Sequence, residues 1–233
     1  MPRIPRQRLG PGVFHVINRA IDRRWIFDTD ADKRFFVETL VTQRKNYALN
    51  IYHWVVMSNH FHLAVETLNV KTLSSYVGKV CEHYTKYYHK KHCGIEPLWQ
   101  GRYNCQVVQK EGYLGRLGRY IERNPIRAKM SNVQYAWDYK WSSAQSYVSE
   151  NKDPLVVESD HPFWVDMGIA DQARRATYRD YLLSDVDAIE EDETIFRSHK
   201  SVVGDNDFKS KVMDVMGRPI ARKPGRPAAS IAK

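Results

Sequence analysis

Short stretches rich in apolar, β-branched and aromatic residues recur in the first half of the chain and predict β-strands. Successive side chains of a strand point to opposite faces, so a half-buried strand alternates apolar and polar residues. The predicted strands cover 13–18 (VFHVIN), 48–57 (ALNIYHWVVM), 60–66 (HFHLAVE) and 103–109 (YNCQVVQ). The pair Ser58 and Asn59 predicts a tight turn between the second and third strands.

Between these strands the apolar residues recur with the helical period of about 3.6 residues. Helices are predicted over 31–46, 71–91 and 110–123. Asp28, Thr29 and Asp30 are candidate caps for the first helix, and a Thr or Ser is expected to cap the second. Pro125 ends the third helix, because a proline disfavours helical geometry in the residue before it.

The order β-α-β-β-α-β-α predicts an α+β fold of the ferredoxin-like kind, an antiparallel sheet with helices packed on one face. The other face of the sheet is expected to be available for function. Aromatic residues over 131–148 are expected to pack back on this unit. Residues 1–150 are therefore predicted to form the first domain.

Residues 151–233 are predicted to form a C-terminal appendage. Helical patterns cover 171–183 and 205–216, and an acidic segment covers 185–193. The chain then ends in a stretch rich in Pro, Gly, Ala and basic residues, which is expected to be disordered on its own.

The charge of the chain is divided between these two parts. The formal net charge is +9; residues 1–150 hold 23 Lys and Arg against 12 Asp and Glu, and residues 151–233 hold 13 against 15. A basic first half suggests a polyanionic partner. No apolar run approaches the length of a membrane helix, and no secretory signal is recognisable. The expected location is the cytoplasm.

Two histidines on one predicted strand are the first candidate site. His60 and His62 are two positions apart, so both imidazoles point to the same face. Two imidazoles on one face form a partial ligand set for a divalent ion. The alternative is that both are ordinary surface or packing histidines.

The second candidate lies in the third predicted helix. Tyr120 and Asn124 are four residues apart and share one helical face. Asn124 offers a neutral oxygen to a metal ion, and Tyr120 offers a phenol to a phosphate. A phenol has a pKa of roughly 10, so it needs activation before it acts as a nucleophile. The alternative is a core tyrosine followed by an Asn-Pro helix stop.

Taken together, these segments resemble a known family. The ordered set MSNHFHLAVE, LWQGRY and RYIERNPIRAKM resembles the HUH single-tyrosine transposases, and among them the REP-associated tyrosine transposases. The resemblance covers about residues 10–148. It implies that His60, His62 and Asn124 bind a divalent metal ion, Mg²⁺ or Mn²⁺, and that Tyr120 is the nucleophile. Relatives usually have Gln at the position of Asn124. Tyr113, seven residues before Tyr120, is the alternative nucleophile.

The reaction that the resemblance implies is cleavage and rejoining of one DNA strand. Metal binding to the scissile phosphate withdraws charge from phosphorus. Attack by Tyr120 then forms a 5′-phosphotyrosine and releases a 3′-hydroxyl, and a second 3′-hydroxyl reverses the step. The implied partner is single-stranded DNA with a hairpin, bound by a monomer or a homodimer.

Basic and aromatic side chains are the candidate DNA contacts. Trp99 and Tyr103 are candidates for base stacking. The stretch RKPGRPA resembles an AT-hook, which places arginine in a narrow minor groove. Arginines near Tyr120 are expected to stabilise phosphate charge. The full set of candidate arginines is Arg3, Arg6, Arg8, Arg19, Arg23, Arg24, Arg102, Arg116, Arg123, Arg127, Arg222 and Arg226.

Two other functions remain open at this point. A ferredoxin-like sheet can also serve as a nucleic-acid-binding module without strand transfer. A metal-dependent hydrolase would cut DNA without a covalent intermediate. The acidic segment 185–193 is expected to dock on the basic DNA face.

Overall fold

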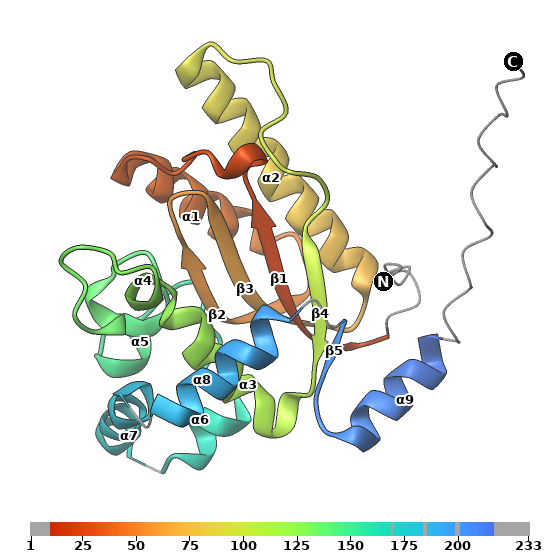
Figure 1. Ribbon diagram of the computed structural model, residues 1–233, viewed down its shortest axis with the longest axis vertical. Coiled ribbons are helices and arrows are strands. Elements are labelled where there is room, and N and C mark those ends of the chain that lie inside the picture. Colours follow the sequence, from red (N-terminus) through yellow and green to blue (C-terminus); the bar gives the residue numbers. More distant parts are fainter. Residues whose placement is uncertain (1–9, 169, 184–185, 199–200, 217–233) are drawn as a thin grey trace, which may run out of the picture.

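The computed structural model describes residues 10–168, 170–183, 186–198 and 201–216. Its centre is a five-stranded sheet in the order β2-β3-β1-β4-β5 (Figure 1). The strands are β1 (Gly12–Arg19), β2 (Leu49–Val56), β3 (His60–Thr67), β4 (Asn104–Val108) and β5 (Val202–Val203). The first four strands pair antiparallel to one another, and β5 adds to β4 in parallel.

This arrangement confirms the predicted α+β fold and the order of its first elements. The helices α1 (Asp30–Arg44) and α2 (Val70–His92) follow β1 and β3, as expected. A capping box between Thr29 and Asp32 starts α1. The cap of α2 is Asn69 and not the Thr or Ser expected, because the helix begins one residue earlier, at Val70.

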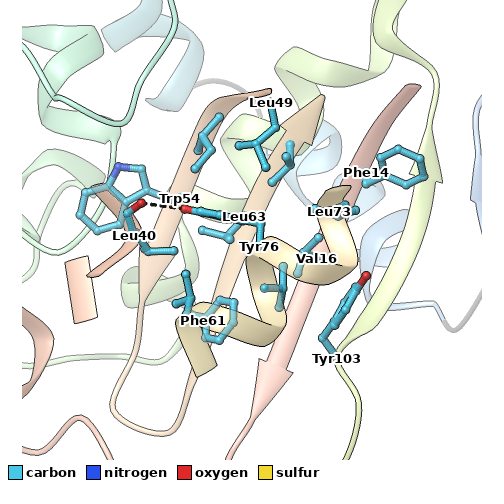
Figure 2. Packing of buried hydrophobic residues seen from close by; sticks show 14 of the residues in the cluster. Phe14, Val16, Leu40, Leu49, Trp54, Phe61, Leu63, Leu73, Tyr76 and Tyr103 are labelled. Atoms are coloured by element: carbon cyan, nitrogen blue, oxygen red, sulfur yellow. Dashed lines mark hydrogen bonds between the residues drawn. The ribbon is translucent and has the colours of Figure 1, made fainter. Parts of the chain in front are cut away.

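One face of the sheet carries a continuous apolar core under α1 and α2 (Figure 2). Phe61, Leu63 and Val65 of β3 all point to this side and are 0% exposed. The hydroxyl of Tyr76 in α2 donates to the carbonyl of Leu40 in α1 at 3.0 Å, which joins the two helices over the core. This face is a conventional hydrophobic layer between sheet and helices.

The other face is covered as well, and this corrects the expectation that helices pack on one face only. Helix α3 (Lys110–Glu122) lies across β1, β2 and β3 on the side opposite α1 and α2 (Figure 1). A Cβ atom at Gly118 would approach the His53 ring to 2.4 Å, so glycine there permits close contact with β2. The period of a helix shows that one side is buried but not which face of a sheet buries it.

The remaining chain adds short helices that pack beside and over α3. Tyr147, Trp164, Tyr178 and Leu182 are at most 1% exposed and form a third apolar cluster. The elements are η2 (Ile21–Arg23), α4 (Asn124–Arg127), η3 (Ala136–Asp138), α5 (Ala144–Val148), α6 (Pro162–Asp166), α7 (Asp171–Leu183), α8 (Val186–Arg197) and α9 (Asn206–Met216). In the part of the chain that the structure describes, none of the helices is both long and apolar enough to cross a membrane.

Candidate active site

The two candidate histidines lie side by side on the face of β3 that α3 covers. His60 pairs with Arg19 of β1 and His62 pairs with Ile17. The two imidazole rings have centroids 5.1 Å apart. His62 is only 3% exposed. Both rings therefore stand under a helix and not on an open sheet surface.

His60 is held by two asparagines. Its Nδ1 is 2.6 Å from Oδ1 of Asn59, the residue of the preceding turn. On the other side the side chain of Asn124 lies within hydrogen-bonding reach, and it tends to raise the pKa of His60 as an acceptor would. Burial outweighs this and lowers the pKa of His60 to about 3. At neutral pH the ring is uncharged, which is the form that ligates metal ions.

His62 contacts a histidine that the sequence analysis did not single out. Its Nδ1 is 2.9 Å from Nε2 of His15 in β1. Nδ1 of His15 is 2.7 Å from Oε1 of Gln106 in β4. Burial lowers the pKa of His15 to about 4 and that of His62 well below its ordinary value. The three strands thus contribute one continuous set of polar side chains.

Tyr120 projects from α3 onto this set. Its ring forms T-shaped contacts with those of His62 and His15, with ring centroids 5.9 and 5.6 Å apart. The tyrosine is 5% exposed, and burial raises the pKa of its hydroxyl. The guanidinium of Arg127, 4.6 Å from the ring centre, opposes that rise. A cation at this place favours the phenolate that a nucleophilic tyrosine requires.

Asn124 begins the short helix α4, just after α3. Its Nδ2 donates to the carbonyls of Tyr120 and Ile121, both at 3.0 Å. This leaves Oδ1 toward the histidines, where it accepts from Arg127. The structure therefore brings together the four side chains predicted from the sequence, His60, His62, Tyr120 and Asn124.

These side chains fit a divalent metal ion. Within the described residues, no cluster of three or more His, Cys, Asp or Glu side chains is arranged to hold a metal, so an ion at His60 and His62 needs a ligand of another type. The Oδ1 atom of Asn124 supplies one. Nδ1 of His60 is directed at Asn59, and the side chain of Asn124 lies within reach of the same ring.

Tyr113, the alternative nucleophile, has different surroundings. It stands at the start of α3, just after the non-helical residues Glu111 and Gly112. Its ring faces the guanidinium of Arg116 at 5.6 Å. The contacts with His15 and His62 belong to Tyr120.

Two of the arginines expected near Tyr120 are engaged elsewhere. Arg116 forms ion pairs with Asp192 and Glu191 of α8, at 2.6 and 3.0 Å. Arg123 donates to the carbonyl of Leu182 at 2.5 Å. The guanidinium of Arg127 lies over the Tyr120 ring, and Arg19 lies close enough to lower the pKa of His60. A small hollow beside Tyr120 is lined by Arg119, Arg123, Arg127, Ile189, Asp192 and Glu193.

The two aromatic residues chosen for base stacking pack inside the molecule. Tyr103 is 6% exposed, and its hydroxyl lies 3.0 Å from that of Ser74. Trp99 is half-buried, and its indole nitrogen donates to Thr85 at 3.0 Å. Both side chains complete the core under α2, which explains why they do not lie on an open surface.

Trp25, by contrast, is 66% exposed and was missed. It lies in the loop after η2, and Asn59 ties this loop to the turn before His60 by donating to the Arg23 carbonyl at 2.9 Å. Arg23 and Arg102 are exposed, whereas Arg24 donates to the Pro97 carbonyl at 2.8 Å. The sequence signal was an aromatic residue directly after two arginines. Arg3, Arg6, Arg8, Arg222 and Arg226 lie outside the described residues.

Comparison with known proteins finds a matching family model and a solved structure of similar fold. Residues 12–124 match the family model described as "Transposase IS200 like". A solved structure of a REP-associated tyrosine transposase bound to a REP hairpin is similar in fold, with a TM-score of 0.54 and 18% sequence identity. The match covers 67% of this chain and 92% of that one. None of the curated proteins matches this chain significantly.

Proposed function

We propose that this chain, whose residues 12–124 match the model of the IS200-like transposases, cleaves and rejoins single-stranded DNA at hairpin sequences. The observation that carries the proposal is the contact of Tyr120 with His62, at 5.9 Å between ring centroids, beside Asn124 and His60. A nucleophile and a set of neutral metal ligands meet there, although they come from a helix and a strand far apart in sequence.

The proposed cleavage is a transesterification at phosphorus. The Tyr120 oxygen forms a bond to phosphorus, and the bond from phosphorus to the 3′-oxygen breaks. The phenol loses its proton, and the departing oxygen gains one as a 3′-hydroxyl. The product is a 5′-phosphotyrosine, and attack by another 3′-hydroxyl reverses the step. The phosphodiester energy is retained in the covalent bond, so no nucleotide cofactor is needed.

His60, His62 and Asn124 would hold the divalent ion, Mg²⁺ or Mn²⁺. When bound, the ion would supply Lewis-acid stabilisation of the phosphate oxygens. Arg127 stabilises the phenolate of Tyr120 and, with Arg19, provides positive charge for the scissile phosphate. Burial of the site strengthens these interactions, because charges interact more strongly away from water.

The nature of the DNA is a further part of the proposal. The similar solved structure is bound to a REP hairpin, which supports a hairpin as the substrate. Trp25 and Arg23 form an exposed aromatic and basic surface beside the turn before His60, and Arg102 is exposed as well. We expect this surface to receive unpaired bases beside the hairpin. In the cytoplasm, the location expected from the sequence, the protein would have access to such DNA.

The test is incubation of the protein with a labelled single-stranded hairpin and Mn²⁺ or Mg²⁺, followed by denaturing electrophoresis. The proposal predicts a metal-dependent protein-DNA adduct and a free 3′-hydroxyl fragment. Cut DNA without an adduct would instead indicate a hydrolase. Binding of intact DNA with no cleavage would indicate a binding module.

A further inference from the structure

His15 is a buried polar residue whose place in the site is not explained by the proposed reaction. It lies in the middle of β1, is 0% exposed, and its ring is nearly coplanar with that of His62, with centroids 5.2 Å apart and planes 17° from parallel. Burying a polar ring at the centre of a sheet is costly unless its nitrogens are paired. Both nitrogens are paired, one with Gln106 and one with His62.

The donor and the acceptor in each of these hydrogen bonds follow from the contact between Gln106 and Ser198. Nε2 of Gln106 donates to the carbonyl of Ser198 at 2.8 Å, and a carbonyl can only accept. The amide oxygen of Gln106 must therefore face His15 and accept from its Nδ1 at 2.7 Å. A neutral imidazole carries one hydrogen, so Nε2 of His15 accepts from Nδ1 of His62 at 2.9 Å.

The consequence appears at the far side of the His62 ring. With its hydrogen on Nδ1, His62 has a lone pair on Nε2. The same result holds for His60, because Asn59 donates its Nδ2 to the Arg23 carbonyl and turns its oxygen toward Nδ1 of His60. Both histidines therefore use Nδ1 for an outer hydrogen bond and present Nε2 as an acceptor. Metal-binding histidines are fixed in this way by their outer partners.

We propose that His15 and Gln106 are positioning residues that hold His62 in the Nδ1–H form and direct its Nε2 to the divalent ion. The inference rests on the proposed metal ligation by His62. It extends the site to a third and a fourth segment of the chain, β1 and β4. It also gives the C-terminal region a role, since the Ser198 carbonyl just after α8 orients Gln106.

Two measurements test the proposal on the full-length protein. The first is nuclear magnetic resonance of histidine ring nitrogens in metal-free protein, which reports the hydrogen-bearing nitrogen of His62. We expect the Nδ1–H form in the wild type and a shift toward the Nε2–H form in Gln106→Leu. If His62 of the wild-type protein carries its hydrogen on Nε2, this measurement alone overturns the proposal.

The second measurement is the affinity for Mn²⁺ alone, by calorimetry. Loss of an outer-shell partner weakens metal binding roughly 10- to 100-fold, and we expect this range for Gln106→Leu. The variant Gln106→Glu keeps an acceptor for His15 but cannot donate to the Ser198 carbonyl, so it should bind Mn²⁺ more weakly than the wild type and more tightly than Gln106→Leu. Circular dichroism confirms that each variant is folded.

The variant His62→Ala separates this inference from the proposed function. One informative outcome is that His62→Ala abolishes Mn²⁺ binding while Gln106→Leu keeps both the wild-type affinity and the wild-type form of His62. This outcome would support His62 as a metal ligand and overturn the positioning role of His15 and Gln106. Wild-type affinity of His62→Ala for Mn²⁺ would overturn the assignment of His62 as a metal ligand, and with it the positioning role of His15 and Gln106.

Discussion

The two faces of the central sheet bury different kinds of side chain. Under α1 and α2 the strands contribute Phe61, Leu63 and Val65, which belong to a continuous apolar cluster. Under α3 the same strand contributes His60 and His62, which are held by polar partners. The apolar face needs no directed contacts, whereas each polar group on the α3 face requires a specific partner.

A covered face of a sheet can therefore hold the candidate active site. The sequence indicated an open face for function, yet α3 closes it and delivers Tyr120 in doing so. Stability is expected to depend mainly on the α1 and α2 face. Chemistry is expected to depend on the α3 face.

Replacing Tyr120 should remove the reaction altogether. Tyr120→Phe deletes one oxygen, so folding and hairpin binding should stay close to wild type. Cleavage and the covalent adduct should both disappear, because no other group supplies the attacking atom. Tyr113→Phe, on the same helix, is the matched control and should retain both. The reverse pattern in the gel assay would assign the nucleophile to Tyr113.

Neighbouring substitutions on β3 should separate the two faces. His62→Ala on the α3 face should abolish metal-dependent cleavage and leave DNA binding intact. Leu63→Ala on the opposite face should cost about 2–5 kcal/mol of unfolding free energy and leave cleavage by the folded protein near wild type. Urea unfolding and the cleavage assay measure the two quantities. Full cleavage by His62→Ala would show that the polar face is not the catalytic one.

Trp25 is the exposed aromatic residue of the proposed DNA-binding surface. Trp25→Ala should weaken binding of single-stranded DNA by about 1–3 kcal/mol, the contribution of one stacked base. Trp25→Phe keeps an aromatic ring and should lose less. Fluorescence anisotropy with a labelled oligonucleotide measures both. Equal affinity of the alanine variant and the wild type would place the bound bases elsewhere.

The smallest effect concerns α8, which covers the outer side of α3. Asp192 pairs with Arg116 and Arg119 at 2.6 and 2.7 Å. Asp192→Asn should weaken the ion pairs with both arginines and leave them more available to phosphates. Nonspecific DNA binding should then be tighter at low salt and depend more steeply on salt. Glu190→Gln removes the same charge from an exposed position of α8 and serves as the control. Identical changes in both variants would attribute the effect to net charge alone.

Much of the fold could be predicted because its signals are local. The strands and the helices α1, α2 and α3 follow periodic patterns, and their boundaries shift by only a few residues in the structure. Strand β5 has two residues and depends on pairing with β4, so no local pattern marks it. The face that α3 covers depends on Gly118 fitting against His53, a contact between distant segments.

The site divides in the same way. His60 and His62 share a strand face, and Tyr120 and Asn124 share a helical face, so local spacing was enough to group each pair. His15 stands alone in an apolar strand, and only the pairing of β1 with β3 and β4 brings it to His62 and Gln106. Contacts of this kind depend on tertiary structure and have no signature in one segment.

The most direct test of the central claim is identification of the residue that carries DNA in the covalent adduct. Trypsin cleavage after Lys and Arg places Tyr120 in peptide 120–123 and Tyr113 in peptide 111–116, each with a single tyrosine. Mass spectrometry of the nuclease-trimmed and trypsin-digested adduct should find a nucleotide on peptide 120–123. A nucleotide on peptide 111–116 or on any other residue would contradict the assignment of Tyr120 as the nucleophile.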